Sequence, residues 1–501
     1  MWLNKGHKFW DQTLLNELLE GLPDTERRIV VVPGTINSVE EVNEKLAKYP
    51  KVLVIITSDE ENKFPVDQLD HPDKIVYMTY PLLPTSNVDR FLPIGSPPDA
   101  KMIENKKKDL DWFFSGQVNH DSRMNVARVL RGLEGGKLVE TGGFSQGLEH
   151  KEYYDLMSRA KVVPSPGGAH SPDSFRLYEA LEAGAIPIAD TPDFWKMLFG
   201  GYPFPAPQDW TTLKELIGNL KDRPEERGRV FAWWLRKKRE LRYMLEDDLE
   251  VPREKLTVLV ATSPIPSHPQ TRIIEETVVS VRERTNAEII LMIDGVREEQ
   301  EDRKYNYQVY IHDLLWLCKQ WGKCYPMIFD THQHQANMTR EALRCVRTPT
   351  VMFMEHDTPL REKPWSIPLD EMCEVIEGGK VNLIRLHYEA SVLDVHQHLM
   401  PSKEPQMVGD VPLLKCAQWS QRPHLASTEF YRKIIDEYFP VTSRTMIEDK
   451  MYGVLENAWF TRGLAGWNDF KVWMYAPEGD IKRSLNLDGR EDDPKYPMKY
   501  E

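Results

Sequence analysis

The 501-residue sequence predicts an α/β fold in which parallel sheets are covered by helices. The first observation is that short runs rich in Val and Ile, typical of buried strands, alternate with helical segments. The second is length, because 501 residues exceed what one ordinary core accommodates. The third is that the alternation stops at a charged stretch near the middle of the chain and then begins again. We therefore expect two Rossmann-like subdomains followed by a separate mixed α/β domain.

The first subdomain is expected over residues 1–105. Its predicted strands are the apolar runs at 27–33, 51–58 and 74–80. A helix over 38–50 joins the first two strands, and Ser38 with a following Glu has the spacing of a capping box. The Pro-rich stretch at 92–100 ends this pattern.

The second subdomain is expected over 106–220. Its predicted strands lie at 109–117, 136–141 and 161–165, and its predicted helices at 121–133 and 151–160. The range 174–190 is expected to be a helix, a Gly and then a strand. Because ligands of such sheets bind beyond the carboxyl ends of the strands, we expect a cleft between the two subdomains. The charged segment 221–254 is interpreted as a solvated helical linker with one aromatic face.

The remaining domain is expected over 255–501. Its predicted elements are strands at 255–266, 287–295 and 349–360, with helices at 271–284 and 306–320. The last residues, 488–501, are rich in charge and proline and are expected to form a loosely packed tail.

Composition narrows the functional classes. The formal net charge of −14 does not favour generic binding of nucleic acid. The five cysteines are odd in number and lack paired metal spacing, so we expect reduced thiols rather than disulfides or a zinc site. No apolar run approaches the roughly 20 residues that cross a bilayer, and no signal-peptide pattern opens the chain. These features predict a cytoplasmic protein.

The segment 162–190 predicts a site for a nucleoside diphosphate. A loop rich in Pro, Gly and Ser leads into a helix, so that free backbone amides and the helix dipole favour a phosphate. Arg176 lies in the first turn and is suited to a bidentate phosphate contact. Glu179 lies one turn later on the same face and offers a carboxylate to ribose hydroxyls. The alternative is an ordinary amphipathic helix that ends at Gly184.

This segment resembles the exostosin-like glycosyltransferases. More loosely, it resembles the two-Rossmann, or GT-B, transferases, in which a Glu five residues before a Gly holds the donor ribose, as Glu179 precedes Gly184. The stretch 115–123 is similar to the glycine turn that opens the same domain. By this resemblance the donor would contact Gly116, Arg123, Ser174, Arg176 and Glu179.

The segment 351–360 predicts a metal site. Glu355 and Asp357 follow an apolar strand at i and i+2, which places both carboxylates on one side of the chain. Carboxylates at a strand end are costly unless paired or used, and Mn²⁺ or Mg²⁺ is a typical partner. Such an ion would bridge the two phosphates of a nucleotide sugar and neutralise the leaving group. A purely structural acid pair is the alternative.

The Glu-His-Asp sequence resembles the DxD motif of GT-A glycosyltransferases, with Glu in place of the first Asp. The preceding segments resemble the donor-binding parts of that fold and imply four further donor-binding residues: Thr262, Asp294, Asn337 and Arg340. The resemblance also implies that an acid in the late helix 446–453 deprotonates the acceptor hydroxyl, either Glu448 or, by preference, Asp449. No His lies beyond residue 424 to complete a metal shell.

Together these patterns predict a nucleotide-sugar-dependent glycosyltransferase with two transferase sites. The expected donor is a nucleotide diphosphate sugar, with UDP as the expected nucleotide, and Mn²⁺ or Mg²⁺ is expected in the second half. The expected acceptor is a glycan or a hydroxymethylated base of phage or viral DNA, although the net charge disfavours DNA. Two alternatives stay open: one active half with the other as a binding scaffold, or a non-catalytic protein that binds nucleotide sugars or glycans.

Overall fold

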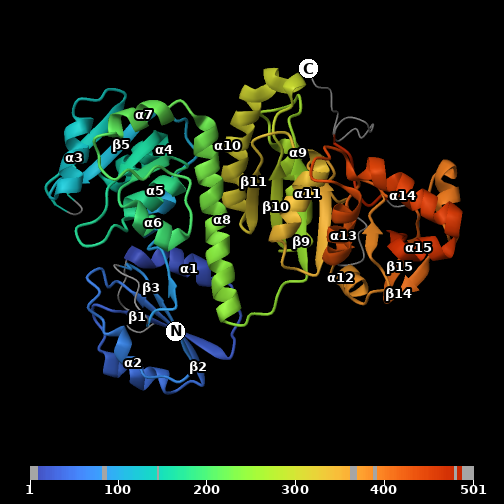
Figure 1. The fold of residues 1–501 in the computed structure, drawn as a ribbon, viewed down its shortest axis with the longest axis horizontal. Coiled ribbons are helices and arrows are strands. Elements are labelled where there is room, and N and C mark those ends of the chain that lie inside the picture. The colour runs from blue at the N-terminus through green and yellow to red at the C-terminus, as the bar shows by residue number, and fades with distance from the viewer. Residues whose placement is uncertain are drawn as a thin grey trace. The chain divides into compact units, whose positions relative to one another are not determined.

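The computed structural model divides the chain into two compact units, Met1–Pro252 and Arg253–Glu501. Both combine parallel strands with covering helices, which confirms the predicted α/β class (Figure 1). The structure describes residues 10–81, 87–143, 146–361, 369–387, 392–478 and 482–487. The expected C-terminal tail lies outside these residues. Within them, no helix combines the length and apolar character needed to span a bilayer.

The first sheet of the first unit has four parallel strands in the order β1-β2-β3-β4. Their bounds are Arg27–Pro33, Lys51–Thr57, Lys74–Met78 and Arg90–Phe91. Helix α1 (Thr13–Leu19) precedes the sheet, and α2 (Val39–Leu46) joins its first two strands. The predicted capping box is confirmed, because the Ser38 and Glu41 side chains each accept from the other's backbone N–H.

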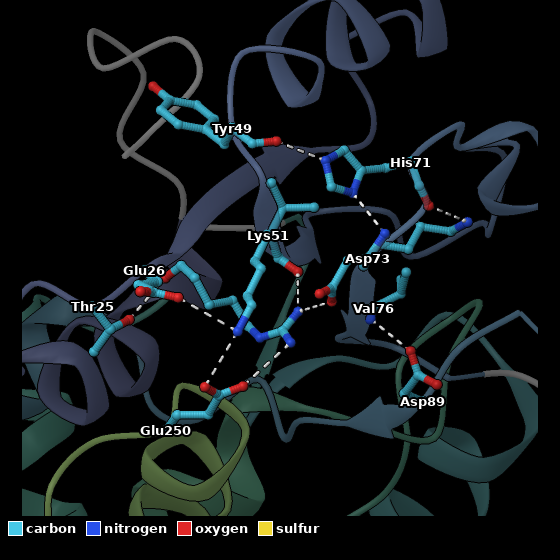
Figure 2. Close-up of polar contacts among 12 residues, drawn as sticks. Thr25, Glu26, Tyr49, Lys51, His71, Asp73, Val76, Asp89 and Glu250 are labelled. Atoms are coloured by element: carbon cyan, nitrogen blue, oxygen red, sulfur yellow. Dashed lines mark hydrogen bonds and ion pairs between the residues drawn. The ribbon is translucent and has the colours of Figure 1, made fainter.

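A polar network holds the amino ends of these strands (Figure 2). The Arg27 guanidinium lies 2.7 Å from the Asp73 carboxylate and donates to the Val52 carbonyl at 3.3 Å. Glu250, just after the long helix α8, lies 3.4 Å from the Lys51 ammonium. The network joins β1, β2 and the segment after α8 at the sheet edge opposite the carboxyl ends.

The second sheet of this unit is also parallel, in the order β6-β5-β7-β8. Its strands, in chain order from β5, are Leu110–Gln117, Gly136–Thr141, Ala160–Ser165 and Ile186–Ala189. The helices that follow or cover them, from α3 to α7, are Asp121–Leu130, His150–Arg159, Phe175–Glu182, Pro192–Phe199 and Leu213–Leu220. The predicted alternation in this part of the chain is therefore confirmed.

The structure differs from the predicted solvated linker at 221–254. Helix α8 (Pro224–Asp248) contributes Val230, Trp234, Leu241 and Leu245 to the core that the two sheets of this unit share. These residues are spaced by four, seven and four positions, so they lie along one face of the helix. Apolar burial on that face makes α8, the long green helix of Figure 1, an integral part of the first unit.

The second unit contains a nine-stranded mixed sheet within the described residues, in the order β11-β10-β9-β12-β16-β13-β17-β15-β14. Strands β9 to β12 pair in parallel, as do β13 and β17, and β16, β15 and β14 pair antiparallel with their neighbours. The strands from β9 to β17 are Leu256–Thr262, Glu288–Ile293, Cys324–Ile328, Thr350–Glu355, Leu383–Arg385, Gln406–Val408, Val411–Lys415, His424–Ser427 and Val472–Tyr475. The three predicted strands are β9, β10 and β12, and the others were not predicted.

Helices cover this sheet, and some of them contribute polar residues beside its edge. From α9 to α15 they are Arg272–Arg282, Lys304–Trp321, His334–Cys345, Leu369–Glu377, Thr428–Tyr438, Ile447–Arg462 and Leu464–Phe470. Strand β12 lies at the centre of the sheet, between β9 and β16. Its carboxyl end therefore brings Glu355 to the middle of the sheet edge.

Candidate functional site

A cavity of about 370 Å³ opens in the first unit, and both parallel sheets contribute to its walls. The first sheet and the segments around it contribute Trp10, Glu60, Tyr80, Ile94 and Pro97. The second sheet and its helices contribute, among others, Ser115, Gly116, Arg123, Ser174, Arg176 and Glu179. The predicted cleft between the two subdomains is present, and all five donor-binding residues predicted for this half line it.

Arg176 reaches the cavity from the first turn of α5. Its Nη2 atom donates to the Ser115 carbonyl at 2.6 Å, and the guanidinium carbon lies 4.5 Å from the centre of the Phe114 ring. Its Nε and Nη1 atoms are buried without a hydrogen-bond partner among the described residues. A Cβ atom at Gly116 would collide with Nη2, so the absence of a side chain there makes room for this arginine.

Arg123 reaches the same cavity from α3. Its Nε atom donates to the Gly167 carbonyl at 3.3 Å. Burial, and then the positive charge of Arg176, lower the pKa of Arg123 to about 10. Among the described residues neither guanidinium has a carboxylate within ion-pair distance. Two neighbouring half-buried cations repel each other, so this arrangement favours an anion with more than one charge.

Ser174 and Glu179 complete this wall. Ser174 is the residue before α5, and its hydroxyl is buried without a partner among the described residues. The Glu179 carboxylate accepts hydrogen bonds from the Tyr153 and Tyr154 hydroxyls at 2.6 and 2.9 Å. Burial raises the pKa of Glu179, while the two hydroxyls act in the opposite direction. This wall of the cavity thus combines unpartnered donors with an acid, Glu179, that is already engaged.

A second cavity, of about 480 Å³, lies in the second unit. Glu355, Asp357 and Glu448 line it, together with Ser420, Gln421, Arg422 and Asn486. The Glu355 carboxylate accepts from Gln335 Nε2 at 3.4 Å, and the Glu448 carboxylate accepts from the Gln421 backbone N–H at 2.9 Å. Asp449 is exposed and is not part of this lining, so Glu448 is the acid of helix α14 that faces the cavity.

The oxygen ligands of this cavity suit a hard divalent cation only in part. Carboxylates are typical ligands of Mn²⁺ and Mg²⁺. Among the described residues, however, no group of three His, Cys, Asp or Glu side chains is placed to hold a metal ion. The two carboxylates of Glu355 and Asp357 supply only part of the roughly six oxygen ligands that such an ion takes.

The structure does not bring the other four predicted donor residues to this cavity. The Thr262 hydroxyl lies 3.0 Å from the Tyr310 hydroxyl in the core. The Asp294 carboxylate accepts the backbone N–H groups of Gln333 and His334 and so holds the start of α11. Arg340 donates to Asn337 Oδ1 at 2.6 Å and to the Ile435 carbonyl at 3.1 Å, so both side chains face α13.

Several lining residues were not predicted from the sequence. Glu60 follows strand β2, and Gln421, Arg422 and Asn486 lie in loops of the second unit. The rule that ligands bind beyond the carboxyl ends of parallel strands was a usable signal for Glu60. No comparable signal marks the other three, because they come together only through the antiparallel half of the sheet.

No family model matches the sequence, and no curated protein matches it either. Similar solved structures include S. aureus TarS, at 12% identity over 46% of this chain and 36% of that chain, with a TM-score of 0.30. Mannosyltransferase PcManGT from Pyrobaculum calidifontis, in complex with GDP-Man and Mn²⁺, has 12% identity, 46% and 56% coverage and a TM-score of 0.29. GalNAc-T7 with UDP, GalNAc and Mn²⁺ has 12% identity, 44% and 42% coverage and a TM-score of 0.29. This chain thus spans between about a third and three fifths of their length.

Proposed function

We propose that the protein is a glycosyltransferase that uses nucleotide diphosphate sugars, with one donor site in each unit. The observation that carries the proposal is the pair of half-buried guanidiniums, Arg123 and Arg176, in one cavity at the carboxyl ends of two parallel sheets. Desolvating a charged group costs several kcal/mol, as an order of magnitude. A bound diphosphate would offset that cost for both arginines.

In the first unit, the diphosphate would lie against Arg123, Arg176 and the backbone amides at the start of α5. The Ser174 hydroxyl, which has no partner among the described residues, would donate to a phosphate oxygen. Glu179 would share its carboxylate between the two tyrosines and a ribose hydroxyl. Negative charge grows on the diphosphate as the sugar leaves, so these fixed donors stabilise the transition state more than the ground state.

In the second unit, Glu355 and Asp357 would hold Mn²⁺ or Mg²⁺. When bound, the ion supplies positive charge to the leaving diphosphate. Glu448 faces the same cavity and would accept the proton of the acceptor hydroxyl, a role for which Asp449 had been preferred on sequence grounds. Asp294 would act indirectly by fixing the start of α11, and Thr262, Asn337 and Arg340 would support the surrounding core.

For the acceptor we propose a glycan. A hydroxymethylated DNA base is the less favoured candidate, because a net charge of −14 repels a polyanion at long range. If only one unit is active, the second unit is the better candidate for a binding scaffold, because its two carboxylates depend on a metal ion that the protein alone holds weakly.

A thermal-shift panel on the full chain tests the proposal. UDP, GDP and their sugar conjugates are added in EDTA or in Mn²⁺, with AMP as the monophosphate control. We expect at least one nucleoside diphosphate to raise the unfolding midpoint in EDTA, through the arginine site, and a further rise in Mn²⁺. A ligand at 100 times its Kd stabilises by about 2.7 kcal/mol, which is readily measured. If no nucleoside diphosphate shifts the midpoint under either condition, the proposal is wrong.

A further inference from the structure

The arginine site of the first unit has donors for a leaving group, but transfer to a hydroxyl also releases a proton. We propose that Glu60 is the catalytic base of this site, an inference that rests on the proposed function. Glu60 would take the proton from the attacking hydroxyl. No sequence motif drew attention to it.

Glu60 lines the same cavity as the second-sheet residues that would hold the donor, but it comes from the first sheet. It follows the carboxyl end of β2, whereas Arg123 and Arg176 come from helices of the second sheet. Its Oε1 atom lies 3.1 Å from the position that a Cβ atom would take on Gly168, in the loop before α5. Its negative charge also raises the pKa of Arg123, against the effect of burial. The carboxylate is therefore close to both the loop and the cation pair.

The backbone around Glu60 is fixed by the acids that flank it in space. The Asp11 carboxylate accepts from the Ser58 backbone N–H at 2.6 Å and from the Ser58 hydroxyl at 2.7 Å. The Asp59 carboxylate accepts the backbone N–H groups of Lys63 and Phe64, at 2.9 and 3.0 Å. Both acids thus hold the loop, and Glu60 is left to project into the cavity.

The other carboxyl groups that line this cavity are poorly suited to the role. Glu179 accepts hydrogen bonds from two tyrosines. Asp173 accepts from the Tyr178 hydroxyl at 2.5 Å and from the Ile94 backbone N–H at 3.2 Å, so both of its carboxylate oxygens are engaged. Glu60 makes no hydrogen bond or ion pair with the described residues. It is the acid in the lining with both oxygens available.

The step balances without a further reagent. The hydroxyl O–H bond breaks as its proton passes to the Glu60 carboxylate, and the oxygen lone pair forms a bond to C1 of the donor sugar. The bond between C1 and the phosphate oxygen breaks, and its electron pair leaves with the nucleoside diphosphate beside Arg123 and Arg176. Attack from the face opposite the leaving group inverts the configuration at C1.

The test measures nucleoside diphosphate release by the full chain from UDP-glucose, UDP-N-acetylglucosamine and GDP-mannose, with water as acceptor. EDTA is present, and release that Arg176→Ala removes is assigned to the first unit. Glu60→Gln is compared with Glu61→Gln, because Glu61 is the adjacent, exposed acid and pairs with Lys63. We expect Glu60→Gln to lower the assigned release about a hundredfold or more. Its affinity for UDP or GDP, by calorimetry, should stay near wild type, and Glu61→Gln should change neither quantity.

Azide separates a catalytic base from a structural residue. The azide anion attacks C1 without losing a proton, so sodium azide should restore release to Glu60→Ala and yield the glycosyl azide, with little effect on the wild type. Retention of near-normal release by Glu60→Gln would overturn the inference while leaving the proposed function intact. Equally, loss of release that azide does not restore would show that Glu60 acts structurally. If wild type shows no nucleotide binding and no release that depends on Arg176, the proposed function fails and this inference fails with it.

Discussion

The cavities of the two units present different charged groups to a ligand. The first has two guanidiniums, Arg123 and Arg176, among three carboxyl groups, whereas the second has the carboxylates of Glu355, Asp357 and Glu448 and one guanidinium, that of Arg422. If both bind a diphosphate, the first unit holds it with cations that are part of the chain. The second unit needs a metal ion to reverse the sign of its cavity.

The two cavities would therefore neutralise a bound diphosphate in two different ways. Fixed guanidiniums are always present, so the first unit bears their desolvation even when no ligand is bound. In the second unit most of the positive charge arrives only with the ion. The first site should therefore be independent of metal and the second should depend on it, and this contrast can be tested by substitution.

The largest expected effect comes from removing one charge centre at a time in the full chain. Arg176→Ala should abolish the donor turnover that persists in EDTA, and Asp357→Ala the turnover that requires Mn²⁺. Each loss should be roughly a hundredfold or more, because each removes a group that stabilises developing charge. Nucleoside diphosphate release, followed in parallel in EDTA and in Mn²⁺, gives the two activities separately.

Each variant serves as the control of the other in this experiment. Arg176→Ala should leave the Mn²⁺-dependent turnover unchanged, and Asp357→Ala the turnover in EDTA. A single activity that either substitution removes would contradict the contrast between two independent sites. Turnover in only one condition would leave one transferase and one binding unit.

The sequence was most informative where chain position alone determines location. Residues that follow an apolar strand must lie at a sheet edge, which placed Glu355 and Asp357 correctly at the cavity. Ser174 and Arg176 open a helix directly after a strand and loop, so they too were placed correctly. In both segments the backbone path dictates the position, and little depends on distant neighbours.

The sequence was least informative where the direction of a side chain depends on tertiary partners. Arg340 lies on a predicted helix, but only the fold shows that its partner is the Ile435 carbonyl of α13. Asp294 was placed at its strand end, yet it is occupied by the backbone of α11. The aromatic face of α8 was noted, but its high charge led to the prediction of a solvated linker, whereas Val230, Trp234, Leu241 and Leu245 pack in the core of the first unit.

A smaller effect is expected from Gly116→Ala. The added methyl group would displace the Arg176 guanidinium from the Ser115 carbonyl without removing its charge. Loss of one oriented charge-assisted contact is worth about 1.5 kcal/mol or somewhat more, or roughly tenfold in affinity. Calorimetry of UDP or GDP binding in EDTA measures this change.

Gly132→Ala is the matched control for that substitution. Gly132 follows α3 in the same sheet region, and a Cβ atom there would meet no atom within 4 Å. The control should bind the nucleotide like wild type. Wild-type affinity in Gly116→Ala would mean that the position of Arg176 does not limit binding at the first site.

One buried group in each unit should contribute to stability with an opposite dependence on pH. Burial raises the pKa of Asp173 in the first unit to about 7, from an unfolded value of about 3.9. Between those values the folded state keeps a proton that the unfolded state has lost, so this contribution to stability decreases as the pH rises. In the second unit, burial lowers the pKa of His424 to about 4. There the unfolded state binds the extra proton up to about pH 6.5, so stability increases as the pH rises.

The last expected effect follows from Asp173→Asn, which removes this titrating group but keeps its shape. The difference in free energy of unfolding between wild type and variant should change by at most about 1.4 kcal/mol per pH unit between about pH 4 and 7. For a unit of this size, that is roughly 3 to 6 °C in unfolding midpoint per pH unit. Thermal unfolding at pH 5, 6 and 7 measures it, and the constant cost of changing the Tyr178 hydrogen bond cancels in the comparison. A difference that stays constant with pH would show that Asp173 is ionised in the folded unit, and that the buried acids beneath the arginine site carry negative charge.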